Sequence, residues 1–284
     1  MRSRNTIRHP AVAGRFYPAE PSRLRADIER MVRAAPVAQS NGVCAVLAPH
    51  AGYPYSGLLA AAALRCVRVR ADSTVVVIAP SHVEAFDFTS VFANGAYRTP
   101  LGDVEVDVQL ANALCHAAGG IRCSPRGHDV PASGRGEHAV EVELPFLQYL
   151  HDAFRVVPIV MGSQSWQASV ELGTAIAECA TANTVIVASS DLSHFYEADV
   201  AERMDSRFLD ALSTSEPRAV YDGVASGSCA ACGAGPVVAA LVAAAGVGRS
   251  GYELIGRAHS GDVTGDRTSV VGYAAAVLGA KAQT

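Results

Sequence analysis

Short apolar segments alternate with longer amphipathic ones along most of the chain. The short segments are rich in β-branched residues and predict strands at residues 43–48, 74–79, 86–92, 156–160, 184–189, 252–258 and 269–277. The longer segments have apolar residues at helical spacing and predict helices beginning at Pro21 and spanning residues 57–67, 104–118, 137–150, 166–180, 198–212 and 236–245. Strands that alternate with helices of this length are typical of an α/β layered fold.

The same pattern indicates which strands are central and where the domain ends. Segments 43–48, 74–79 and 184–189 are apolar on both faces, as strands are when helices cover both sides of a sheet. No linker divides the chain, and residues 119–136 are interpreted as a loop inside one domain. We therefore expect a single-domain sandwich over residues 1–284, with a central, mostly parallel or mixed sheet flanked by helices. Residues 1–10 are expected to form a flexible tail.

The amino-acid composition argues against several classes of protein. Half of the 284 residues are hydrophobic, 18% are charged, and the net charge is −4. This composition argues against long disorder, and the absence of a basic excess argues against binding to nucleic acid or to an anionic membrane. The longest apolar run, residues 236–247, is shorter than the roughly 20 residues that a membrane span needs. The seven cysteines, an odd number, predict free thiols and a cytoplasmic, reducing location.

Each of the three central segments is followed by histidine or aspartate. His50 follows the first, His82 the second, and Asp191 and His194 the third. Ligands bind at the carboxyl ends of strands in open α/β sheets, and imidazoles suit iron, copper, zinc and nickel. Taken alone, each of these residues is more often a turn or capping residue. Three such endings in one chain favour a shared site, provided that the strands are parallel and adjacent.

Two further motifs have both a functional and a structural interpretation. Cys229 and Cys232 form a C-x-x-C before an apolar helix, where a thiolate is favoured, but they equally fit a tight turn of small buried residues. Glu137 and His138 could line a site, although a glutamate is also what the first turn of a helix prefers. The G-x-G-x-x-G at residues 246–251 follows a helix and precedes a strand, so it predicts a turn and no nucleotide cofactor.

Taken in order, these segments resemble one known family. The motifs are A-V-A-G-R-F-Y-P at 11–18, P-H-A-G-Y at 49–53, P-S-H at 80–82, Y-R-T-P-L-G at 97–102, E-H at 137–138, E-L-P-F at 143–146, S-S-D-L-S-H at 189–194 and C-G at 232–233. The chain resembles the Memo family, called AmmeMemoRadiSam system protein B in prokaryotes. That family is similar in fold to class III extradiol dioxygenases, which are non-haem iron(II) enzymes.

The resemblance implies a site. It assigns His50, His82 and Cys232 to a metal ion, iron(II) or alternatively copper, and it places Asp191 and His194 beside that metal as catalytic groups. It further implies that Glu137, His138, Tyr55 and Ser81 support the pocket. The family name implies a functional link to a radical-SAM protein, while the small-molecule or peptide ligand stays unknown.

Two residues of this sequence differ from the pattern of related proteins, so more than one reaction type is compatible with the site. A cysteine stands where the dioxygenases have a carboxylate ligand, and Ala234 stands where relatives often carry an arginine that could bind an anion. Cys229 could also pair with Cys232 and remove the ligand. The alternatives are therefore a metal-dependent, dioxygenase-like oxidoreductase, a non-catalytic metal-, peptide- or partner-binding protein, and a Ser/His/Asp hydrolase without a nucleophile elbow.

Overall fold

The computed structural model describes residues 6–129 and 136–280, and its larger sheet has nine strands in that part of the chain. In spatial order they are β10 (His194–Tyr196), β12 (Val270–Gly279), β2 (Ala45–Ala48), β9 (Thr184–Ser189), β3 (Thr74–Pro80), β8 (Arg155–Met161), β4 (Thr89–Val91) and β7 (Ile121–Cys123), with β11 (Glu253–His259) also paired to β12. Strands β2, β9, β3 and β8 are parallel, whereas β12 runs antiparallel to β2 and β4 runs antiparallel to β8. The sheet is therefore mixed, with a parallel centre.

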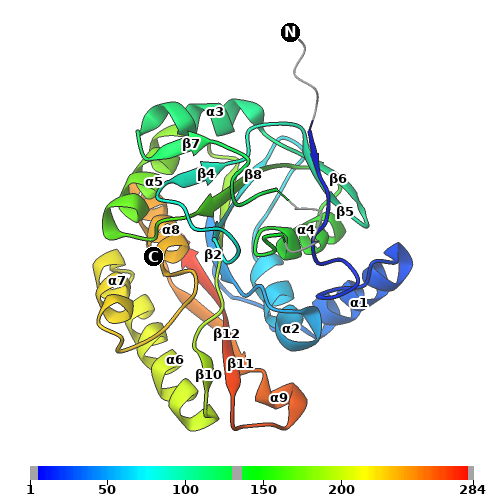
Figure 1. The fold of residues 1–284 in the computed structure, drawn as a ribbon, viewed down its shortest axis with the longest axis vertical. Helices are drawn as coiled ribbons and strands as arrows, with labels where there is room; N and C mark the ends of the chain where they lie inside the picture. The colour runs from blue at the N-terminus through cyan, green and yellow to red at the C-terminus, as the bar shows by residue number, and fades with distance from the viewer. Residues whose placement is uncertain (1–5, 130–135, 281–284) are drawn as a thin grey trace.

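Helices cover both faces of this sheet (Figure 1). One layer contains α3 (Val108–Ala117), α5 (Trp166–Cys179), α6 (Ala198–Ser213), α7 (Pro217–Ala225) and α8 (Ala234–Gly246); the other contains α1 (Pro21–Ala34), α2 (Tyr53–Leu64) and α4 (Leu144–Leu150). The single turn α9 (Gly261–Thr264) lies between β11 and β12. Every residue of β2, β3 and β9 is buried, because helices pack on both sides of these strands. The predicted single-domain α/β sandwich is confirmed.

A small second sheet corrects two predictions. It consists of β1 (Ile7–Arg8), β5 (Ala96–Thr99) and β6 (Gly102–Glu105). Residues 7 and 8 belong to a strand, so this part of the expected flexible tail is ordered, while residues 1–5 lie outside the described residues. The predicted helix 104–118 begins only at Val108, since residues 102–105 form a hairpin with β5 and the Asp107 carboxylate caps the helix through the Leu110 N–H.

Three other boundaries differ from prediction. The expected helix 137–150 begins as the 3₁₀ turn η1 (Glu141–Glu143) and continues as α4, so the preceding residues are free to face the sheet edge. Of the expected strand 86–92, only residues 89–91 form a strand that pairs with its neighbours in the sheet. Helix α2 begins at Tyr53 and not at Gly57, because Pro54 fits a first helical turn.

A disulfide joins Cys115 in α3 to Cys123 in β7, with Cα atoms 5.8 Å apart. The expectation that all cysteines are free thiols is therefore wrong for this pair. Cys123 lies in residues 119–136, which the sequence predicts as a loop, and a loop pattern does not show that Cys123 approaches α3. Among the described residues, no helix has both the length and the apolarity that crossing a bilayer requires.

Candidate metal centre

The carboxyl ends of three neighbouring strands meet at one edge of the sheet. β2 pairs with β9 and β9 with β3, all in parallel, so the expected adjacency is confirmed. His50, His82 and Asp191 each follow their strand by two residues. The backbone N–H of His50 donates to the Asp191 carboxylate at 2.9 Å, which ties two of these strand ends directly together.

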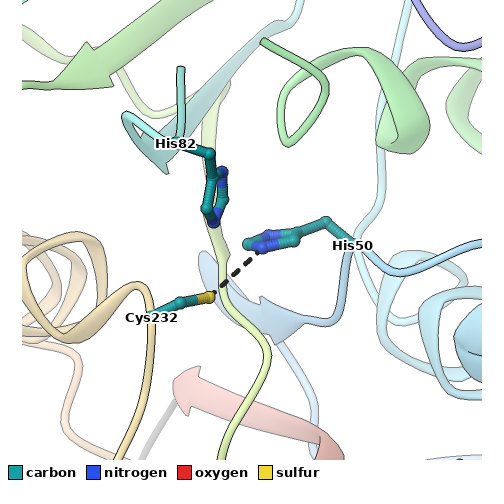
Figure 2. Close-up of side chains that lie close together, drawn as sticks. All are labelled: His50, His82 and Cys232. Carbon is teal, nitrogen blue, oxygen red and sulfur yellow. Dashed lines mark hydrogen bonds between the residues drawn. The ribbon is translucent and has the colours of Figure 1, made fainter. Parts of the chain in front are cut away.

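Cys232 reaches the same point from the turn before α8. The potential ligand atoms of His50, His82 and Cys232 all lie within 4.8 Å of one another, and the Cys232 Sγ is 3.2 Å from the His50 Nε2. Figure 2 shows the three side chains pointing toward a common centre. Gly233 permits this approach, since a Cβ on it would lie 2.5 Å from the carbonyl oxygen of Ser189. Two imidazoles and a thiol are a ligand set that suits a transition metal.

A buried hydroxyl fixes the His50 ring. His50 is 1% exposed, and its Nδ1 lies 2.8 Å from the Ser189 Oγ, which in turn donates to the carbonyl of Ala139 at 2.7 Å. This chain makes Nδ1 the protonated nitrogen and leaves the Nε2 lone pair facing Cys232. Burial, reinforced by the nearby imidazoles of His82 and His138, holds the pKa of His50 well below its usual range. A neutral imidazole is the form that binds metal.

A carboxylate fixes the His82 ring. The Glu137 side chain is 3% exposed, and its Oε1 accepts from the His82 Nδ1 at 3.0 Å, so Nε2 is again the free nitrogen. Burial alone would lower the pKa of His82, but the hydrogen bond and charge of Glu137 outweigh it and raise that pKa. Burial would raise the pKa of Glu137, but the hydrogen bonds and charges of His82, with the charge of His138, lower it. Glu137 is therefore an orienting carboxylate, not a residue of a helical first turn.

A second group of potential metal ligands lies beside the first and shares His82 with it. It consists of His82, Glu137 and His138. The Glu137 Oε1 already accepts three N–H groups: the His82 ring, the His138 backbone at 2.8 Å and the Ala139 backbone at 3.0 Å. A carboxylate oxygen so occupied is a poor further ligand. His138 instead stacks on His82 with ring centroids 5.0 Å apart, and burial is the largest influence lowering its pKa, to about 4. His138 is therefore a neutral ring packed against His82, and its pocket-supporting role stays a prediction.

Asp191 lies beside the ligands as a buried acid. Its carboxylate is 4.0 Å from the His50 Nε2, and burial raises its pKa to about 7 despite the backbone N–H groups of His50 and Ala51. Its backbone N–H donates to the Cys232 Sγ at 3.2 Å. Burial and the charge of Asp191 raise the pKa of Cys232, so a cation must accompany formation of the thiolate.

His194 begins β10 and lies near the cluster, half-buried. Its Nδ1 donates to the carbonyl of Leu192 at 2.8 Å, which leaves Nε2 as an acceptor. Burial lowers its pKa, with a smaller contribution from His82. The hydroxyl of Ser81 donates to the carbonyl of Glu84, and Tyr55 is 43% exposed in the first turn of α2. The pocket-supporting roles of Ser81 and Tyr55 stay predictions.

A buried polar network behind the site holds the Glu137 segment in place. Arg8, 4% exposed, forms an ion pair with Glu141 and donates to the backbone carbonyls of Glu137 and His128. The His128 ring donates from Nε2 to a backbone carbonyl and accepts at Nδ1 from the hydroxyl of Tyr97. The N-terminal strand thus anchors the segment that orients His82.

Ser189 is a site residue that sequence reasoning missed. The sequence places it at the end of a strand and at the start of the S-S-D-L-S-H motif without giving it a role, yet its hydroxyl orients His50. A hydroxyl at the end of a wholly apolar strand was the available signal, because a buried hydroxyl needs a partner. Cys229, by contrast, is buried and free, so the alternative disulfide to Cys232 is not formed.

Comparison with known proteins agrees with this architecture. Residues 8–277 match the family model described as Memo-like protein. A MEMO1 family protein of Methanopyrus kandleri is 39% identical over 95% of this chain and 98% of its own length, and one of Methanothermobacter thermautotrophicus is 37% identical over 94% and 99%. The fold is similar to that of an uncharacterized protein of Escherichia coli K12, with TM-score 0.54, 15% identity, and coverage of 83% of this chain and 99% of that one. The chain therefore belongs to the Memo-like protein family.

Proposed function

We propose that this protein is a metal-dependent oxidoreductase that holds iron(II), or alternatively copper, through His50, His82 and Cys232. The observation that carries the proposal is the preorganised donor set. Both imidazoles present Nε2 to a common centre, and each is held in that tautomer by a buried partner on Nδ1. Such partners on metal-binding histidines raise affinity and fix geometry.

The donor set favours redox chemistry over a purely structural role. Structural zinc sites are closed by four protein ligands, whereas three ligands leave positions for substrate. A bound iron(II) would supply open coordination positions and one-electron chemistry. The family's similarity to class III extradiol dioxygenases supports oxidation of an organic substrate as the reaction class.

The chain's own residues provide the proton handling that such a reaction needs. The neutral His194 ring has a free Nε2 that can accept a proton from a substrate hydroxyl. Asp191, with a pKa near 7, can hold a proton or release it beside the ligands. Glu137 and Ser189 keep the two imidazoles in place, and the Phe16 ring packs edge-on against that of His138 at 4.8 Å.

Elemental analysis tests this proposal. The full chain is purified without chelator or histidine tag, and bound metals are measured in wild type, His50→Ala, Cys232→Ser and Cys229→Ser. We expect near-stoichiometric iron or copper in wild type and in Cys229→Ser, whose thiol is not a ligand, and loss of metal in the other two. Wild type that stays metal-free after reconstitution with iron(II) and with copper(I) would overturn the proposal and favour a partner-binding role.

A further inference from the structure

A groove opens beside the candidate metal centre. Its volume is about 380 Å³, and its lining includes both the ligand Cys232 and the imidazole of His194. The groove lies between β10, α6, α7 and the turn before α8, elements that adjoin one another in the fold (Figure 1). Its size falls within the range of small-molecule sites, and its position gives a bound molecule access to the reactive groups.

The side chains that line the groove offer no ionic partner to a charged ligand. The remaining lining residues carry no charged side chain: Leu192, Tyr196, Met204, Val224, Gly227, Cys229, Ala230 and Ala231. The nearby guanidinium of Arg207 does not line the groove and donates to the backbone carbonyl of Ser228. Ala234, which follows Gly233, adds no cation either. Away from the metal at its reactive end, the groove gives a charged ligand no partner for the water it would lose, whereas an apolar ligand would gain contact with aliphatic and sulfur groups.

The backbone beside the groove is distorted in a way that exposes aromatic surface. The pairing of β10 with β12 shifts register between His194 and Tyr196, so Phe195 is an extra, bulged residue. Its φ of 63° is unusual for a bulky side chain, and the residue is 76% exposed. Tyr196 is 41% exposed and lines the groove. Strained backbone and exposed aromatic side chains both concentrate at binding sites.

We propose that this groove binds the organic substrate of the metal centre, that the substrate is a small uncharged molecule with an aromatic or aliphatic body, and that Tyr196 and Val224 determine this specificity. The inference rests on the proposed function, because it takes Cys232 and His194 as the reactive end of the groove. Phe195 adds apolar surface next to the His194 ring, 5.7 Å away between centroids.

Fluorine NMR titration of the full chain with a matched pair of probes tests the inference. The neutral probe is 4-fluorobenzyl alcohol and the anionic one is 4-fluorobenzenesulfonate. In the metal-free chain we expect the neutral probe to bind at least about tenfold more tightly, since the side chains of the groove offer no charged partner for an anion. Val224→Asp should weaken the neutral probe by about tenfold or more, and Tyr196→Ala should weaken it as well. Val263→Asp, which changes a 55% exposed valine outside the groove, should bind like wild type.

Metal loading separates failure of this inference from failure of the proposed function. In protein loaded with paramagnetic cobalt(II), the resonance of the bound neutral probe should broaden relative to the zinc(II) form. Equal or tighter binding of the sulfonate to the metal-free chain, or neutral-probe binding that both groove variants leave unchanged, would overturn the inference even where elemental analysis supports the proposed metal site. Selective neutral binding in a chain that takes up no metal would instead refute the proposed function and support the groove.

Discussion

Replacing Glu141 with glutamine should remove a large part of the stability of this protein. Glu141 is completely buried, and its two oxygens accept four donors. One oxygen accepts from Arg8 and from the backbone N–H of Ala11 at 2.7 Å; the other accepts from the backbone N–H of Val12 at 3.0 Å and from the hydroxyl of Tyr17. If the oxygen that faces Arg8 becomes the amide NH₂, two donors face a donor; if the other oxygen does, the Val12 N–H faces a donor and the Tyr17 hydroxyl must turn to accept.

The size of the stability loss follows from the buried charge of Arg8, which keeps no carboxylate partner. Arg8 stays buried in Glu141→Gln with no carboxylate, and removing one partner of a buried ion pair costs about 3–5 kcal/mol. A domain of ordinary stability has about 5–15 kcal/mol in total, so the variant should be recovered in low yield or unfold at a much lower denaturant concentration. The double variant Arg8→Met/Glu141→Leu should lose less than the two single changes added together, because no unpaired charge remains.

Equilibrium unfolding in urea measures the effect, with the slope and midpoint compared between variants. Arg33→Gln is the control, since it breaks an exposed pair with Glu29 and should leave the midpoint unchanged within error. A Glu141→Gln protein that loses less than about 1 kcal/mol would refute the reasoning, because it would mean that the carboxylate contributes no more than a neutral hydrogen bond.

The other predictions concern the metal centre and the pH dependence of stability. Glu137→Gln should weaken metal binding by about 10–100-fold, measured by competition with a chelator, because the neutral amide orients His82 less firmly. Gly233→Ala should fold but bind metal poorly, since its Cβ would contact the carbonyl of Ser189 and push the neighbouring thiol away. Burial lowers the pKa of His128 to about 3, against about 6.5 unfolded, so its contribution to stability is present above pH 6.5 and is lost as pH falls toward 3. The loss should reach about 2 kcal/mol at pH 5, measured as the free energy of unfolding.

Each of these predictions has a control variant or a result that would contradict it. Gly119→Ala adds a methyl group where no atom lies within 4 Å and should keep both fold and metal. His128→Gln should lose about 2 kcal/mol less stability than wild type between pH 6.5 and pH 5, because the other buried histidines still titrate there. The groups facing His128 are Arg8, Tyr97 and Glu137. Arg8 and Tyr97 do not titrate at acid pH, so an unchanged slope in His128→Gln would refute the lowered pKa of His128. Metal retained at wild-type affinity in Glu137→Gln would show that the backbone alone orients the His82 ring.

The sequence determined the elements whose patterning is strong and the strand ends that carry chemistry. Apolar runs buried on both faces identified β2, β3 and β9 as central, because such runs are stable only between helix layers. Adjacency of parallel strands then predicted that the residues after them converge. The motifs assigned Cys232 through family resemblance alone, since nothing in its spacing places it near His50.

Tertiary structure decided what depends on contacts between distant segments. The strand at Ile7–Arg8 is too short to show a pattern, and it forms because Arg8 finds Glu141 in the folded core. The approach of Cys115 to Cys123, and the choice of Glu137 as partner of His82 over the helical first turn, likewise require the assembled sheet. Local periodicity reports which face of an element is buried; it carries no information about which distant polar group that face will meet.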